Sequence, residues 1–98
     1  MKILAIEKDI PEINWDFVNK KLLEQEAFEV HKMYLAGQLR EHYFNEENSA
    51  ILVLECKSKS QAKKLLNGLP LVKRKLIRFE LMELHPYTGY SRIIEAVK

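Results

Sequence analysis

Residues 50–56, Ala-Ile-Leu-Val-Leu-Glu-Cys, restrict the fold more than any other segment, because residues 50–54 are apolar at consecutive positions. Successive side chains of a β-strand point to opposite faces of its sheet, so this strand would have two apolar faces. A layer of helices on one face leaves the other face uncovered. The segment therefore predicts a buried strand and a second contact surface on the far side of its sheet.

Three further segments have strand patterns, at residues 2–8, 38–44 and 75–84. The polar tetrad Asn45-Glu46-Glu47-Asn48 predicts a turn that joins the second and third strands as a hairpin.

Two segments have helical patterns. From Trp15 onward, apolar residues recur at helical spacing between the N-cap candidate Asn14 and a terminal Gly37. The capping-box pattern Ser58-Lys59-Ser60-Gln61 predicts a shorter helix that ends at Asn67-Gly68.

The resulting order is β-α-β-β-α-β. This order predicts an α+β, ferredoxin-like fold, with a four-stranded antiparallel sheet and two helices on one face. The 98 residues leave room for one domain, spanning residues 1–98. Its tail, residues 85–98, has an apolar patch at Ile93, Ile94, Ala96 and Val97 and is expected to dock on a subunit. The uncovered sheet face predicts a homodimer or a higher homo-oligomer.

Composition excludes several classes of protein. Cys56 is the single cysteine, so no disulfide can form within the chain, and a reducing, cytoplasmic location is expected. No apolar run long enough for a signal peptide or a membrane span is present, so no membrane partner is expected. The three histidines are too scattered for metal-ligand spacing, and three glycines cannot build a phosphate loop. We expect neither a metal nor a cofactor.

Residues 57–78 hold eight basic residues and no acidic one. Such a segment could bind an anion or nucleic acid, or could form a solvated helix face and loop. It lacks the interleaved aromatic residues that stack on bases, so nucleic acid is the less favoured partner.

Glu26 falls near the middle of the apolar stripe of the first helix, with Asn19 two turns earlier on the same line. If Glu26 faces the sheet, desolvation raises its pKa and suits it to acid or base catalysis. If the helix is rotated slightly, Glu26 is a solvated charge at the rim.

In the second strand, Arg40 and His42 share one face, and Glu41 and Tyr43 the other. His42 and a helix carboxylate would form a plausible acid/base pair, with Arg40, Tyr34 and Asn19 as ligand-binding residues. The alternative is a half-exposed strand at a dimer seam.

Gly37, Arg40, the segment Leu66-Asn67-Gly68-Leu69-Pro70-Leu71 and the later His85-Pro86 resemble the muconolactone isomerase family. The resemblance implies a dimeric α+β barrel and isomerisation of a small organic acid by proton abstraction. A non-catalytic dimeric barrel that binds a small ligand or a partner is the alternative.

Glu26 matches the helix glutamate of that family, eleven residues before the glycine, and Arg40 matches the arginine three residues after it. The family histidine follows that arginine directly, whereas here Glu41 holds that position and His42 comes next. A one-residue slip turns a strand side chain to the opposite face.

Overall fold

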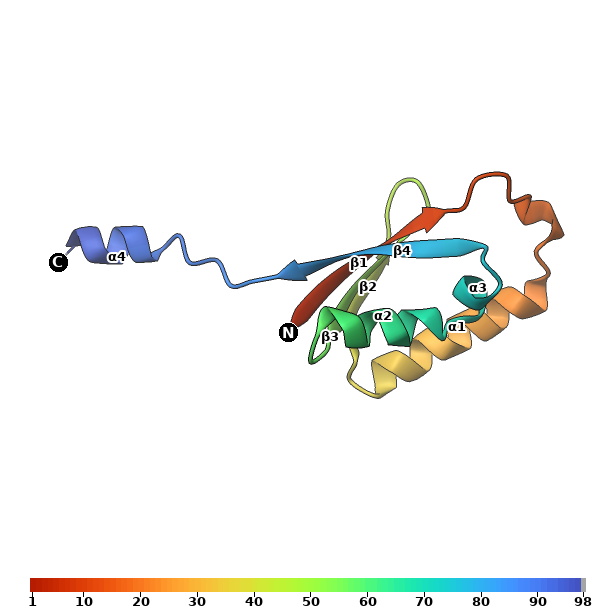
Figure 1. The fold of residues 1–98 in the computed structure, drawn as a ribbon, viewed down its shortest axis with the longest axis horizontal. Helices are drawn as coiled ribbons and strands as arrows, with labels where there is room; N and C mark the ends of the chain where they lie inside the picture. Colours follow the sequence, from red (N-terminus) through yellow and green to blue (C-terminus); the bar gives the residue numbers. More distant parts are fainter. Residues whose placement is uncertain (98) are drawn as a thin grey trace.

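The segment Ala50–Glu55 (β3) lies inside an antiparallel sheet, as its two apolar faces predict. The computed structural model describes residues 1–97, apart from the side chains of Phe17 and of residues 95–97. Its strands are β1 (Lys2–Asp9), β2 (Leu39–Phe44), β3 and β4 (Ile77–Leu84), in the sheet order β2-β3-β1-β4. Its helices are η1 (Trp15–Phe17), α1 (Lys20–Leu35), α2 (Lys59–Asn67), α3 (Pro70–Lys73) and α4 (Ser91–Val97). The predicted α+β, ferredoxin-like order is confirmed, and Figure 1 shows α1, α2 and α3 on one face of the sheet.

The first helix begins later than the sequence pattern predicts. Asn14 caps only the 3-10 turn η1, since its Oδ1 accepts from the Asp16 N–H at 3.0 Å. Val18 then adopts an extended backbone, and Asn19 caps α1 by accepting from the Leu22 N–H at 2.7 Å. The prediction of one continuous helix from Trp15 is therefore wrong, because two asparagine caps divide it.

The predicted ends of α1 and α2 agree better with the structure. Gly37 has φ 80°, the left-handed conformation that favours glycine after a helix. Ser58 caps α2 as predicted, because its hydroxyl accepts from the Gln61 N–H at 3.1 Å. Helix α2 ends at Asn67, with Gly68 as its C-cap.

Helix α3 has no counterpart among the predicted elements. It begins at Pro70, where the first turn of a helix needs no N–H. It ends at Lys73, and two residues later Lys75 adopts the left-handed conformation at φ 60°, a position usually held by glycine. The Leu76 N–H then donates to the Leu71 carbonyl at 3.0 Å. Strand β4 consequently begins at Ile77 and not at residue 75.

The core consists of two clusters on the helix-facing side of the sheet. The larger cluster joins β1, β2 and β3 to α2 and to the C-terminal part of α1, where Met33 is buried. The smaller cluster joins Leu22 near the start of α1 to Leu71 of α3 and Ile77 of β4. Helix α1 is thus fixed to the rest of the protein near both of its ends.

The other face of the sheet has no helix over it (Figure 1). The strand register and the alternation of side chains place several apolar residues there, including Leu4, Ile6, Ile51, Val53, Met82 and Leu84. This surface is hereafter the open sheet face. Its uncovered state agrees with the pattern of residues 50–56, while its role as a contact surface stays a prediction.

The tail continues from β4 and ends in α4, which stands apart from the sheet in Figure 1. A helix is present where the sequence suggests only an apolar patch. Ile93 and Ile94 are 61% and 62% exposed, while the predicted contributions of Ala96 and Val97 lie outside the described side chains. Docking of this tail on a subunit stays a prediction.

Candidate functional site

A cavity of about 620 Å³ lies between the middle of α1 and the helix-facing side of the sheet. This volume is within the range of pockets that enclose small organic molecules. Most of its wall is apolar or aromatic, from Val30 of α1 to Leu52 of β3 and Phe79 of β4. Its ionisable side chains include four acids and bases of potential chemical interest: Glu7, Glu26, His31 and His42.

The two carboxylates occupy positions that the sequence pattern reserves for apolar residues. On α1, Glu26 lies between Leu22 and Val30 on the side that faces the sheet. On β1, Glu7 follows Ala5 on the helix-facing side, since strand residues two apart share a face. The cavity therefore lies where the sheet-facing row of α1 and the helix-facing row of β1 both change from apolar side chains to a glutamate.

Backbone N–H groups hold one oxygen of each carboxylate. Glu26 Oε1 accepts from the Leu71 N–H at 2.9 Å, which ties α1 to α3. Glu7 Oε1 accepts from the Ala50 N–H at 2.9 Å, which ties β1 to the start of β3. Each carboxylate is thus anchored to the backbone of another segment through its Oε1 atom.

Burial raises the pKa of Glu26 above its ordinary value, and the hydrogen bond from Leu71 opposes that rise. The negative charges of Glu7 and Glu29 raise it further. Burial likewise raises the pKa of Glu7, against the hydrogen bond from Ala50. The pKa of each carboxyl group is therefore higher than that of a fully solvated glutamate.

His42 faces the cavity because β2 contains a β-bulge. The register pairs Leu39 with Leu54 and His42 with Leu52, with an irregularity between Leu39 and Glu41. The bulge adds one residue, so that Leu39 and His42 both face the helices although they are three positions apart. His42 is one residue later than the histidine of the family pattern, and the bulge shifts the strand alternation by one residue before it.

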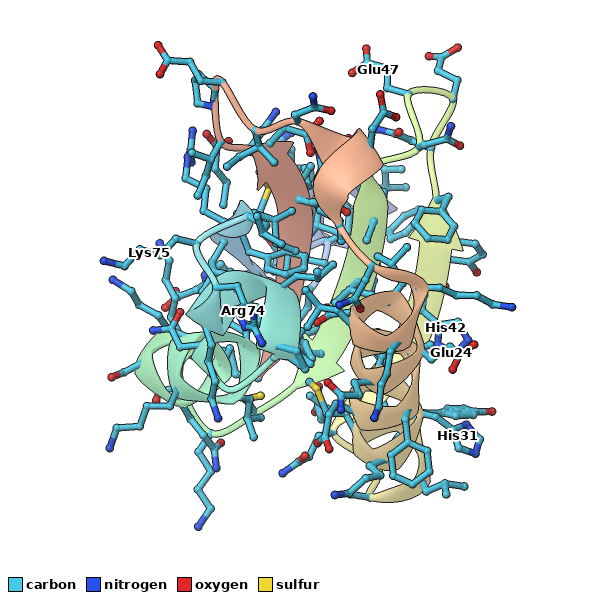
Figure 2. The ribbon with its side chains drawn as sticks, turned by 90° about the vertical axis from the view of Figure 1, so that its right-hand side faces the viewer. Glu24, His31, His42, Glu47, Arg74 and Lys75 are labelled. Carbon is cyan, nitrogen blue, oxygen red and sulfur yellow. The ribbon has the colours of Figure 1, made fainter. Side chains whose placement is uncertain are left out.

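The histidines and a tyrosine form the outer part of the cavity. His31, Tyr34 and His42 are all exposed, whereas Glu7 and Glu26 are half-buried. The rings of Tyr34 and His42 meet edge to face with centroids 5.2 Å apart. Figure 2 shows His31 and His42 on the same side of the molecule. The bases therefore lie at the mouth and the acids lie deeper.

Three of the five predicted site residues line this cavity, namely Glu26, Tyr34 and His42. Arg40 is exposed on β2 and Asn19 serves as the N-cap of α1, and neither is part of the cavity wall. The roles assigned to all five stay predictions.

Two further lining residues, Glu7 and His31, do not follow from the sequence analysis. The alternation of Ile3, Ala5 and Glu7 in one strand contains a signal for the first of them. His31 lies one helical turn after the lining residue Ala27.

A second hollow of about 880 Å³ runs between α2 and β4 and includes Lys59, Lys63 and Arg78 from the basic segment. Glu80 also lines it and forms an ion pair with Arg78 at 3.3 Å. In Figure 2, Arg74 and Lys75 lie on the side of the molecule opposite His31 and His42. The basic segment is therefore separate from the cavity beside α1.

Among the side chains that the structure describes, no three histidine, cysteine, aspartate or glutamate side chains gather as they would around a metal ion. The same part of the chain has no helix with the length and apolar character needed to cross a membrane.

No protein-family model matches the chain, and no curated protein matches it. Among solved structures, it is similar to 5-chloro-2-hydroxyhydroquinone dehydrochlorinase (TftG) from Burkholderia phenoliruptrix, in complex with 2,5-dihydroxybenzoquinone. The TM-score is 0.68 at 12% identity, over 91% of this chain and 98% of the other. This likeness supports the α+β, ferredoxin-like fold. It does not single out the muconolactone isomerase family.

The assignment of Asn19 as a helix cap can be tested by substitution. Asn19→Ala removes the acceptor of the Leu22 N–H, and we expect the free energy of unfolding to fall by about 1 kcal/mol in urea titrations. Asn14→Ala is the matched control, because Asn14 caps only a three-residue turn, and its loss should be clearly smaller. Equal losses at the two positions would contradict the assignment.

Proposed function

We propose that this protein binds a small cyclic organic molecule in the cavity beside α1 and moves a proton on it. The observation that carries the proposal is Glu26, a half-buried carboxyl group with a raised pKa in the wall of a mostly apolar cavity. A general acid or base works best when its pKa approaches the working pH, and burial of a carboxyl group moves its pKa in that direction.

In this proposal Glu26 Oε2 takes a proton from a carbon of the ligand and returns it to another carbon. The Leu71 N–H fixes Oε1 and so orients the carboxylate. His42 is the second acid/base group and acts from the mouth, where its contact with Tyr34 orients its ring. The net reaction is an isomerisation, since the proton that leaves one carbon arrives at another and no other atom is exchanged.

Two likenesses support this choice of ligand and reaction class. The similar solved structure is that of a dehydrochlorinase bound to a dihydroxybenzoquinone, which is a small ring compound. The sequence resembles the muconolactone isomerase family at Glu26, Arg40 and the Gly-Leu-Pro-Leu stretch. The alternative, a protein that binds a small ligand without catalysis, shares the same cavity and differs only in the role of Glu26.

A β,γ-unsaturated cyclohexenone that carries a hydroxyl group is a suitable test compound, because a proton shift converts it to a conjugated isomer that absorbs in the ultraviolet. We expect the wild-type protein to accelerate this shift and Glu26→Gln to lose at least about 100-fold of the acceleration. Glu24→Gln is the matched control, since Glu24 is an exposed carboxylate on the same helix. A Glu26→Gln protein with the wild-type rate would contradict the role of Glu26. Binding without acceleration by the wild type would favour the non-catalytic alternative.

We further propose that two copies of the chain pair through their open sheet faces as a dimeric α+β barrel. The open sheet face has no helix over it, and Met82 there is 46% exposed. Burying such a face against an identical one removes apolar surface from water on both copies.

Sedimentation velocity tests this pairing. The wild type should sediment at about twice the chain mass of 11.6 kDa, and Met82→Glu should shift it towards the monomer because a carboxylate would enter the apolar interface. Phe28→Glu is the control, since Phe28 is 62% exposed on α1, away from the open sheet face. A wild-type protein that sediments as a monomer at micromolar concentration would contradict the proposal.

A further inference from the structure

The proposed function leaves Glu7 unused, although it shares the cavity with Glu26. The two carboxylates come from different elements, β1 and α1, and each is fixed by a backbone N–H of a third segment. Both are half-buried, and the charge of Glu7 acts on Glu26. A pair of fixed acceptors at the inner part of an apolar cavity constrains what the cavity can hold.

The charged and titratable groups around this pair are mostly acidic. Asp9 of β1 acts on Glu7, and Glu29 of α1 acts on Glu26. The bases in the wall are His31 of α1 and His42 of β2, both exposed at the mouth, where Tyr34 and Tyr43 also lie. Among the described residues, no lysine or arginine lines the cavity.

These surroundings discriminate between ligand charges. A carboxylate placed at the inner end would be repelled by two acidic groups in a site of reduced dielectric constant, where charge interactions are stronger than in water. A hydroxyl or ammonium group placed there would donate hydrogen bonds to the carboxylates of Glu7 and Glu26.

We propose that Glu7 and Glu26 together select a ligand whose inner group donates hydrogen bonds and carries no negative charge, on a ring-sized apolar body. Glu7 is then a specificity-determining residue. The inference rests on the proposed function only in placing the ligand in this cavity. The two carboxylates would also orient an organic acid in the cavity, because its own carboxylate would have to point to the histidines at the mouth.

Benzyl alcohol, benzylamine and benzoate test the inference, because they share a ring and differ in the charge of one group. In titrations followed by ¹⁵N NMR, the amide signals of Ala50 and Leu71 report on Glu7 and Glu26 directly. At neutral pH we expect the alcohol and the amine to shift these signals. We expect benzoate to bind at least about tenfold more weakly than benzylamine, an effect of the size that one close charge contact produces.

Glu7→Gln should lower the preference for benzylamine over benzoate several-fold, because it removes one acidic group and keeps an acceptor for the Ala50 N–H. Glu80→Gln on β4 is the control and should leave the preference unchanged, since Glu80 lies outside the cavity wall. An unchanged preference in Glu7→Gln would overturn the inference. Equal binding of benzoate and benzylamine by the wild type would also overturn it, and that result does not depend on the variant folding.

The two proposals fail in different ways. If only the inference about Glu7 is wrong, Glu26→Gln still loses the isomerisation while the charge preference is absent. If the proposed function is wrong, Glu26→Gln keeps its activity or none of the three compounds shifts the signals of Ala50 and Leu71.

Discussion

Two carboxylates, Glu7 and Glu26, stand where α1 crosses the sheet and where apolar side chains would otherwise close the core. Packing α1 tightly over them would strip both groups of water, at a large cost in free energy. The helix is instead fixed near its two ends by Leu22 and Met33, which belong to separate core clusters. The cavity is the space between these two attachments.

Other parts of the fold follow from how these carboxylates are held. Helix α3 supplies the Leu71 N–H to Glu26, and the first residue of β3 supplies the Ala50 N–H to Glu7. The bulge in β2 then turns His42 to the same side of the sheet. Segments β1, α1, α3, β3 and β2 thus all contribute to one cavity, on the side of the sheet away from the open sheet face.

The order of elements could be predicted because strand alternation, helical spacing and the cap at Ser58 are local signals. Helix α3 could not be predicted in this way. The left-handed position after a helix is usually a glycine, which is visible in the sequence, but here it is Lys75. The hydrogen bond between Glu7 and the Ala50 N–H joins residues far apart in sequence. Neither strand alternation nor helical spacing can predict such a contact. The position of Glu26 could be predicted from the helix stripe alone, whereas Asn19 on the same line proves to be a cap.

We infer that both carboxylates are kept in the cavity wall at a cost in stability. Urea unfolding of the wild type and of the double variant Glu7→Gln, Glu26→Gln tests it between about pH 4 and pH 7. Since both pKa values are raised above 4.5 in the folded protein, the folded state binds more protons than the unfolded state just above that pH. The wild type should therefore lose free energy of unfolding relative to the double variant as the pH rises above about 4.5. Parallel curves, or a wild type that gains stability relative to the variant, would contradict the account.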